Sequence, residues 1–496
     1  MDDDRFDETE EFIPLVSDRT ENLEDTMEIL QKKVKPMSRE ERHFNEYDED
    51  FVDIVKRKVH QSHEEDEEDK PHKRKLKKWV YYSFGAFILI IGLIVFLVVN
   101  GKMKAENNKK LIEDIKSHYS EYVKVNKDTP IYLLKGKDNK YIETGTIYKG
   151  AVIKLEEERV IDEETKYFHV KDDLLEDYYI PYDTVVKTDK PEIDKRHENY
   201  LPFDKAINIE KATLYLNDEK LITVNLGTGL SVPIIINDYE GKYYINYNGM
   251  LVGIKKEEIK EINTWQINGK KNQSKITTLA YHRVYDEGDK CTDAYVCIKK
   301  ENFDKEMKYL SDNNYLTLTL NELYMYLNGN IQVEKAVVIT FDDGYLYKAA
   351  DEVLRKYNLN GTMFVITGDF SDFTPFKELT NLEVQSHTNN MHRNYVCSGG
   401  NQGGAILCAG EEKVKEDLLS SIKKLGTEPI GMAFPFYDYN DTAIKGVKAA
   451  GFKMAFVGRA GQMGKATPKV TDLYKIPRMT VYDFSLMSFN EWKGYL

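Results

Sequence analysis

The stretch AVVITFDDGY, residues 336–345, joins a short apolar run to two adjacent aspartates, Asp342 and Asp343. Strand-like and helix-like runs alternate around it from about residue 275 to residue 496, which is typical of a parallel α/β sheet or barrel. In such folds the chemistry lies at the carboxyl ends of the strands. Two neighbouring carboxylates on a turn face different ways, so one can bind a metal ion while the other handles protons.

A second strand-like run, LEVQSH, ends at His387, and His392 follows within the stretch SHTNNMH. Two histidines at this spacing do not share a helix face, so they indicate a loop around an ion. One aspartate and two histidines leave coordination positions open for water and substrate, as in a catalytic metal site. Each motif alone has a simpler interpretation, because Asp-Asp-Gly is a common turn and surface histidine pairs are frequent. Together, after two strands of one α/β unit, they favour catalysis.

The stretches TFDDGY, SHTNNMH, AFPFYDYN and KIPRM closely resemble the polysaccharide deacetylases of carbohydrate esterase family 4, the NodB homology domain. The resemblance covers residues 275–496 and implies a distorted (β/α) barrel that removes acetyl groups from N-acetylglucosamine-type sugars. It implies that Asp343, His387 and His392 bind a divalent metal ion, usually zinc. It also implies that Asp342 is the general base.

The same resemblance places the oxyanion donor on the backbone N–H of Phe436, which follows Pro435. The sequence departs from the family at this third motif, where Ala433 and Phe436 stand in place of the more usual arginine and tyrosine. Arg478, in KIPRM, is the candidate that could replace the missing arginine in orienting Asp342.

The general acid is the second departure, because no histidine follows residue 392. The His-x4-His spacing resembles the family branch that acts on partially deacetylated poly-N-acetylglucosamine, in which the proposed acid is a histidine on the first strand. His282 matches that place. The simpler interpretation is a histidine at a strand end whose nitrogens are satisfied by neighbours.

Residues 79–100, WVYYSFGAFILIIGLIVFLVVN, are uncharged and about 33 Å long as a helix, enough to cross a bilayer. A buried core helix is the weaker alternative, because the run has no polar face. The basic cluster KPHKRKLKK precedes it and is denser than the lysines that follow. By the positive-inside rule we expect a single-pass protein of the cell membrane, with a cytoplasmic N-terminus and residues 101–496 outside.

The four cysteines, Cys291, Cys297, Cys397 and Cys408, all follow the predicted span. An even number confined to an exported part suggests two disulfides. The spacings favour the local pairs Cys291–Cys297 and Cys397–Cys408, although four cysteines allow three connectivities. A metal site is the weaker alternative, because neither spacing is that of a zinc ribbon.

The remaining segments differ in composition. Residues 1–78 are predicted to be a disordered acidic cytoplasmic tail that ends in the basic cluster. Residues 101–123 have helical apolar spacing and are predicted to form a stalk. Residues 124–188 and 200–262 consist of short β-like runs separated by turns, which predicts two small β-barrels. They weakly resemble the Src-homology-type domains of bacterial cell-wall enzymes, and they either space the molecule or bind wall glycan.

With 84 acidic and 70 basic residues, the chain has a formal net charge of -14, which argues against nucleic acid as a partner. The sequence therefore predicts a membrane-anchored N-deacetylase that uses a divalent metal ion such as zinc and binds a cell-surface glycan. Peptidoglycan is the favoured substrate, and an exopolysaccharide such as poly-N-acetylglucosamine is the close alternative. A catalytically inactive wall-binding or signalling protein is the alternative of another class. The sequence does not identify what binds the tail.

Overall fold

The computed structural model describes residues 73–135, 140–156, 166–267, 269–458 and 464–496. The predicted disordered tail therefore lies outside the described residues, except for its last positions, which form the start of a helix. Both predicted disulfides are present, Cys291–Cys297 and Cys397–Cys408.

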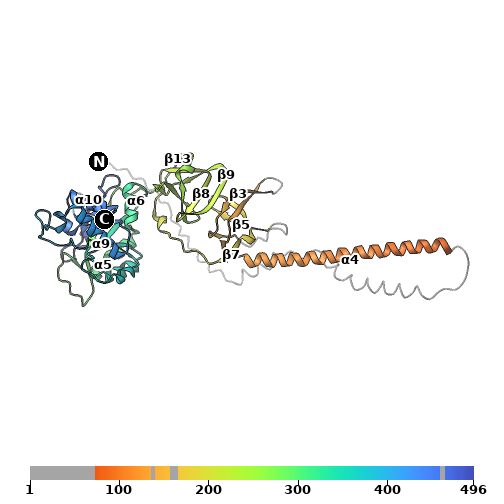
Figure 1. Cartoon of the computed structure of the whole chain (residues 1–496), viewed down its shortest axis with the longest axis horizontal. Helices are drawn as coiled ribbons and strands as arrows, with labels where there is room; N and C mark the ends of the chain where they lie inside the picture. Colours follow the sequence, from red (N-terminus) through yellow and green to blue (C-terminus); the bar gives the residue numbers. More distant parts are fainter. Residues whose placement is uncertain (1–72, 136–139, 157–165, 268, 459–463) are drawn as a thin grey trace, which may run out of the picture. The chain divides into compact units, whose positions relative to one another are not determined.

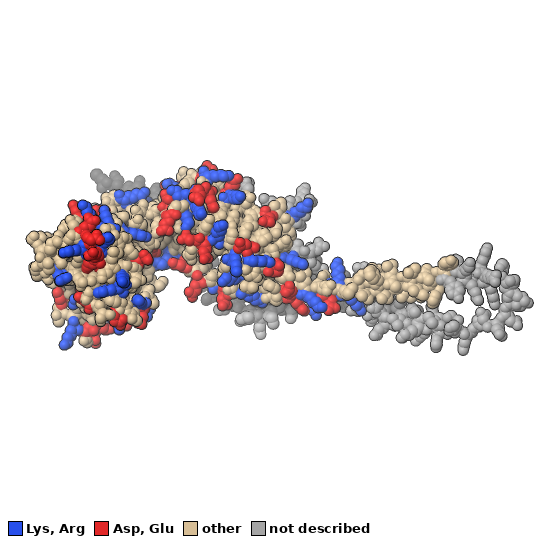
Figure 2. Space-filling model, in the orientation of Figure 1, with Lys and Arg blue, Asp and Glu red and all other residues tan. Residues whose placement is uncertain are grey.

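Helix α4 runs without a break from Lys73 to His118 (Figure 1). It contains the predicted membrane span and is the one helix in the described part of the chain that is long and apolar enough to cross a membrane. Figure 2 shows that much of this helix bears no charged side chain. The predicted stalk is not a separate element, because it continues α4, and its Leu111 and Ile115 pack against the core of the strands that follow.

The strands between residues 122 and 264, here called the β region, alternate buried and exposed side chains, as half-buried strands do. They are β1 (Tyr122–Val125), β2 (Thr129–Lys135), β3 (Lys140–Ile147), β4 (Val152–Lys154), β5 (Tyr167–Asp172), β6 (Glu176–Pro181), β7 (Val185–Thr188), β8 (Lys205–Leu216), β9 (Glu219–Pro233), β10 (Ile236–Tyr239), β11 (Lys242–Tyr247), β12 (Met250–Lys255) and β13 (Ile262–Thr264). Short 3-10 turns at Tyr182–Thr184, Arg196–Asn199 and Lys256–Glu258 connect some of them.

The β region differs from the predicted pair of separate barrels. Its large sheet has the order β10-β11-β12-β8-β9-β3-β2-β6-β5, so the strands of both segments join through the β3–β9 pair, and their buried residues form one apolar core. Gly145 makes this junction possible, because a Cβ there would lie 2.1 Å from the Thr223 carbonyl oxygen on β9. Such a close approach of two backbones leaves no visible signal in the sequence.

The α/β region, residues 276–496, alternates strands and helices as predicted. Its elements are β14 (Ile276–Tyr281), β15 (Arg283–Tyr285), β16 (Cys297–Lys299), α5 (Lys300–Asp312), β17 (Leu316–Thr317), α6 (Leu320–Asn328), β18 (Ala336–Phe341), α7 (Lys348–Lys356), β19 (Gly361–Val365), α8 (Thr374–Lys377), β20 (Leu382–Ser386), α9 (Glu411–Leu425), β21 (Gly431–Ala433), α10 (Asp441–Ala449), β22 (Met454–Phe456), β23 (Lys465–Ala466), β24 (Met479–Thr480) and α11 (Phe489–Lys493). The strands β14, β18 and β19 are buried along their whole length, as a sheet covered on both faces requires.

The sheet of the α/β region has the order β22-β21-β20-β19-β18-β14-β23, with parallel pairs from β22 to β14. It curls, because one late segment reaches both of its sides. Met479 of β24 pairs with Leu279 on β14, and Ile476 bridges Phe456 on β22. The result is a curled mixed α/β sheet whose parallel strands end together on one side, which is where the predicted site residues lie.

Candidate active site

The carboxyl ends of β18 and β20 bring the predicted metal ligands together. Asp342 and Asp343 follow β18, and His387 follows β20, with β19 between the two strands. Asp343 has a φ of 73° and Thr388 a φ of 71°, both in the left-handed region that non-glycine residues rarely adopt. Strained backbone of this kind clusters at functional sites, where the surrounding structure holds it in place.

Asp343, His387 and His392 place one ligand atom each within 4.8 Å of one another. The Oδ1 atom of Asp343 lies 3.9 Å from Nε2 of His387 and 3.6 Å from Nε2 of His392. One carboxylate and two imidazoles suit Zn²⁺ and similar divalent ions, and three protein ligands leave positions open. The side chains present therefore fit a catalytic metal ion.

A hydrogen bond orients the ring of His387, and burial affects the titration of His392. The Nδ1 atom of His387 lies 2.9 Å from the Ala433 carbonyl oxygen, so Nδ1 carries the hydrogen and Nε2 is left with its lone pair toward Asp343. Burial, together with the neighbouring His387, lowers the pKa of His392 to about 4. A metal ion binds the deprotonated imidazole, so the His392 ring does not need to lose a proton first at neutral pH.

Asp342 is buried and forms a bidentate ion pair with Arg478. The Nη1 and Nη2 atoms of Arg478 donate to Oδ1 and Oδ2 of Asp342, both at 2.7 Å, and Nη1 also lies 3.2 Å from the Thr340 hydroxyl. Burial alone would raise the pKa of the Asp342 carboxyl, but the Arg478 guanidinium and His387 hold that pKa well below its usual range. Arg478 is thus where the sequence predicted an orienting arginine.

His282 lies beside Asp342, because Tyr281 pairs with Phe341 across the neighbouring strands β14 and β18. Its Nδ1 atom is buried without a hydrogen-bond partner among the described residues. The simpler interpretation of a satisfied strand-end histidine therefore does not describe it. Burial lowers the pKa of His282, while the charges of Asp342 and Asp343 oppose this shift.

The third motif forms a strained turn next to the metal triad. Pro435 begins a 3-10 turn, and Phe436 within it has a φ of 56°. The Phe436 ring lies 4.3 Å from the His392 ring, centroid to centroid. This contact places the Phe436 side chain beside the histidines, and the backbone N–H of the same residue is the predicted oxyanion donor.

A buried carboxylate ties this turn to the loop closed by the Cys397–Cys408 disulfide. Asp438 is 1% exposed and accepts hydrogen bonds from the backbone N–H groups of Gln402 at 3.1 Å and Gly404 at 2.8 Å, and also from Asn401. The Asn401 side chain donates to the Phe436 carbonyl oxygen at 3.1 Å. The disulfide loop and the Phe436 turn are therefore joined by one carboxylate, which the sequence analysis did not single out.

Helix α9 holds the loop between the two histidines and was also missed. The Asp417 carboxylate accepts the backbone N–H groups of Asn389 and Asn390 at 2.8–3.1 Å. Lys424 donates to the Asn389 side-chain oxygen at 2.7 Å, and Ser421 contacts Ser386 at 2.8 Å. The available signal was a polar stripe at positions 417, 421 and 424, which lies along an otherwise apolar face of this helix.

Replacing Asp417 by alanine should lower the affinity for zinc about 10-fold, because second-layer partners that orient metal ligands contribute at this scale. The loss should come from a looser backbone around Asn389 and Asn390. A competition titration with a zinc chelator measures it. Glu416→Ala is the matched control, since it removes the same charge from an exposed neighbouring position and should leave the zinc affinity unchanged. Equal affinities for the two variants would contradict the positioning role.

Arg283 is a further unpredicted member of the site. Its Nη2 atom lies 3.6 Å from Oδ2 of Asp343, and its guanidinium lies 5.0 Å from the centre of the Tyr345 ring. Its position directly after His282 could have suggested it. It places a fixed positive charge at the edge of the triad.

Residues 329–455 match the family model described as polysaccharide deacetylase. The chain carries a polysaccharide deacetylase domain. The predicted recognition is thereby confirmed, and the matched part includes Asp342, Asp343, His387, His392 and Pro435. His282 and Arg478 lie outside the matched residues, so their roles rest on the structure and on the sequence resemblance.

Curated relatives of the deacetylase domain are N-deacetylating hydrolases. The chain is 27% identical over 218 residues to the poly-beta-1,6-N-acetyl-D-glucosamine N-deacetylase of Staphylococcus aureus strain MRSA252, which covers 40% of the chain and 72% of the relative. It is 27% identical over 219 residues to the putative polysaccharide deacetylase YxkH of Bacillus subtilis strain 168, which covers 42% of the chain and 72% of the relative.

Solved structures also align with the deacetylase domain. The deacetylase PplD of Streptococcus pyogenes, in complex with acetate, aligns with 45% of the chain and 97% of its own length, at 23% identity and a TM-score of 0.38. IcaB from Ammonifex degensii aligns with the same shares, identity and TM-score.

Proposed function

We propose that the chain is a membrane-anchored, metal-dependent hydrolase that removes acetyl groups from N-acetylglucosamine residues of a cell-surface polysaccharide. The observation that carries this is the convergence of Asp343, His387 and His392 beside the ion-paired Asp342. Such a site would combine metal ligands, an ionised carboxylate and a backbone donor at the carboxyl ends of neighbouring strands. These are the groups that hydrolysis of an amide requires.

Poly-N-acetylglucosamine is the substrate that we place first. The sequence analysis favoured peptidoglycan, but the curated relatives named for an activity act on poly-β-1,6-N-acetylglucosamine. The His-x4-His spacing points to the same branch of the family. Peptidoglycan stays the second candidate, supported by the predicted tethering of the chain at the membrane.

The triad would hold the metal ion, and we propose zinc because one carboxylate and two imidazoles suit it. A bound divalent ion would lower the pKa of water and polarise the acetyl carbonyl. Asp342, kept ionised by Arg478, would accept the proton of the attacking water. The backbone N–H of Phe436 would donate to the oxygen of the acetyl group as negative charge develops on it.

The leaving amine needs a proton, and His282 is the group that we propose to supply it. It lies next to Asp342 across the β14–β18 pair, and in the described part of the chain its Nδ1 atom has no hydrogen-bond partner. Because burial lowers the pKa of His282, its protonated form is lost below the ordinary histidine range in the free protein. The high-pH limb of the rate profile, on which the acid loses its proton, should therefore begin below the ordinary histidine pKa.

Replacing His282 by alanine should leave zinc stoichiometry unchanged and lower the deacetylation rate by roughly 100-fold, the scale of one acid–base group. The loss should be greatest for substrates with which protonation of the leaving amine limits the rate. The high-pH limb of the kcat/KM profile should change in shape, which a merely structural defect would not cause. Full activity in His282→Ala would remove the residue from the mechanism.

The proposed anchoring rests on α4, which is long and apolar enough to cross a bilayer. The denser basic cluster on its N-terminal side predicts that the acidic tail is cytoplasmic and that the deacetylase domain is outside. The two disulfides agree with an oxidising compartment for the C-terminal part.

Two measurements on the purified full-length protein test the proposal. The metal content should be about one divalent ion per chain, and acetate should be released from poly-β-1,6-N-acetylglucosamine, with peptidoglycan and chitin oligomers assayed beside it. A protein without metal and without acetate release on all three glycans would be the inactive wall-binding alternative. Release from peptidoglycan alone would reverse the order of the two substrates.

A further inference from the structure

A groove of about 900 Å³ lies between the β region and helix α6 of the α/β region. One wall comes from the β8–β9 hairpin and from β11 and β12, and the other comes from Thr319, Asn321 and Met325. Its size is at the upper end of the range of ligand sites. The linker segment that contains Arg196 and Tyr200 lines it between the two walls.

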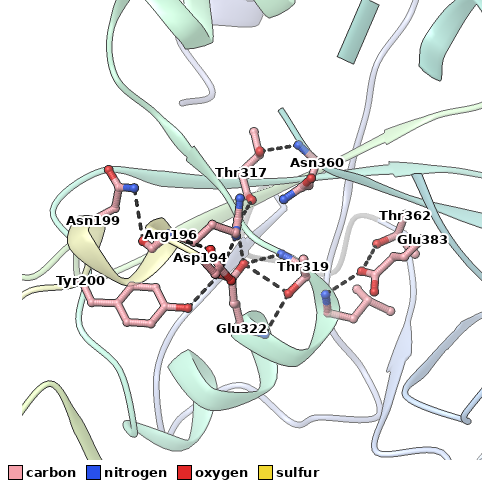
Figure 3. A network of polar contacts seen from close by, with 11 residues as sticks. Asp194, Arg196, Asn199, Tyr200, Thr317, Thr319, Glu322, Asn360, Thr362 and Glu383 are labelled. Carbon is pink, nitrogen blue, oxygen red and sulfur yellow. Dashed lines mark hydrogen bonds and ion pairs between the residues drawn. The ribbon is translucent and has the colours of Figure 1, made fainter. Parts of the chain in front are cut away.

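A polar network fixes the linker segment against α6 (Figure 3). Arg196 Nε donates to Glu322 Oε1 at 3.0 Å and Nη2 donates to Oε2 at 2.5 Å, while the Tyr200 hydroxyl donates to Oε1 at 2.7 Å. Arg196 also donates to the Thr317 carbonyl oxygen at 2.8 Å. Glu322 in turn caps α6, because its carboxylate accepts the backbone N–H of Thr319 at 2.8 Å. These contacts hold the linker side of the groove and the start of α6 in one arrangement.

The chemistry of the lining suits a neutral, hydroxyl-rich ligand. As many acidic as basic side chains line the groove, and several are paired with each other, such as Lys242 with Asp218 and Arg196 with Glu322. A polyanion would require an excess of basic groups, and a basic peptide an excess of acidic ones. A neutral glycan requires neither, and it can use the many remaining polar groups as hydrogen-bond partners.

Tyrosine side chains supply the apolar surface on which a sugar ring can lie. Tyr215 and Tyr244 line the groove and are partly exposed. Tyr244 is braced by the cross-strand Gly253, since a Cβ at Gly253 would come within 3.1 Å of the Tyr244 ring. A tyrosine fixed in this way offers an apolar ring face with a polar tip at low entropic cost.

The groove is distinct from the metal triad. Asp343 and His387 follow the carboxyl ends of β18 and β20, whereas α6 begins just after β17, which pairs with Ala336 and Val337 at the start of β18. The groove lining includes none of the triad residues, and α6 begins near the start of β18 rather than at its carboxyl end. A polymer that engages both would be retained between turnovers, because the second contact is intramolecular.

We propose that this groove is a second glycan site, which binds a neutral N-acetylhexosamine chain away from the catalytic centre. The choice of a glycan as occupant rests in part on the proposed function. The probe is a β-1,6-linked N-acetylglucosamine hexamer, titrated calorimetrically into full-length protein in detergent. The His392→Ala background prevents turnover, so that only binding is measured.

In this background the hexamer should bind, and Tyr244→Ala should weaken its binding at least about 10-fold, as loss of an aromatic anchor does. Asn321→Arg should weaken it similarly by placing a charge in the opposite wall, which guards against a folding defect of one variant. Tyr324→Ala is the control, because Tyr324 is a partly exposed tyrosine of α6 outside the groove lining.

Unchanged affinity in both groove variants would overturn the inference. Absence of hexamer binding in the His392→Ala background would overturn it as well, with the proposed function still standing. Binding that depends on Tyr244, in a protein whose wild type releases no acetate from any glycan, would overturn the proposed function and keep the second site.

Discussion

Asp342→Asn should lower the deacetylation rate at least about 100-fold and leave the metal content near that of the wild type, whereas Asp343→Asn should lower the metal affinity at least about 10-fold. The reason is the split geometry: Asp343 faces the two histidines, and Asp342 faces Arg478. A neutral amide is a weak metal ligand and no base. Metal stoichiometry and single-turnover rates of the two variants measure the split.

The Asp342→Asn variant leaves the buried Arg478 without its counter-charge, which alone could impair folding. The double variant Asp342→Asn/Arg478→Met removes the pair as a unit and serves as the control for folding. It should retain the metal and lack activity. Loss of metal from Asp342→Asn, with full metal in Asp343→Asn, would exchange the two assignments.

Arg478→Met should destabilise the protein by about 3–5 kcal/mol, because it leaves the Asp342 carboxylate buried and unpaired. It should also move the low-pH limb of the rate profile to higher pH. In the wild type the pKa of Asp342 is held below its ordinary value, so its contribution to stability is present above the unfolded pKa and is lost as the pH falls through the folded one.

Without the guanidinium, burial is the main remaining influence and raises the pKa of Asp342, so the carboxylate protonates at a higher pH. Chemical denaturation and kcat/KM between pH 4 and pH 8 measure the two effects. Arg478→Lys is the informative companion, because it restores the charge but not the two-pronged contact. A rate profile identical to that of the wild type in Arg478→Met would show that this ion pair does not set the state of Asp342.

The strand–helix alternation was visible in the sequence because each strand of the α/β region is a short apolar run and each helix has its own period. The site residues followed from their places at strand ends. Arg478 was the boldest of these predictions, and its position 136 residues from Asp342 came from a motif rather than from any local rule. The role of each residue stays a prediction until the variants are measured.

Other features could not be predicted because they depend on contacts between distant segments. Asp417 acts on backbone N–H groups 27 and 28 residues away, and Asp438 acts on a loop 34 to 37 residues before it. A carboxylate that binds backbone leaves no partner side chain to recognise. The junction of the β segments could not be predicted for the same reason, since the need for a glycine at position 145 depends on its contact with Thr223.

The carboxylate of Asp438 also links the Phe436 turn to the formation of the Cys397–Cys408 disulfide. Asp438 follows Phe436 by two residues, and its hydrogen-bond donors lie on the loop that Cys397 and Cys408 close. Without the Cys397–Cys408 disulfide the loop is less restrained. The buried Asp438 carboxylate beside the Phe436 turn can then lose its backbone hydrogen-bond donors. Under the topology proposed above, a newly made chain in a reducing compartment would lack this disulfide, and thiol oxidation after export would complete the support of the Phe436 turn.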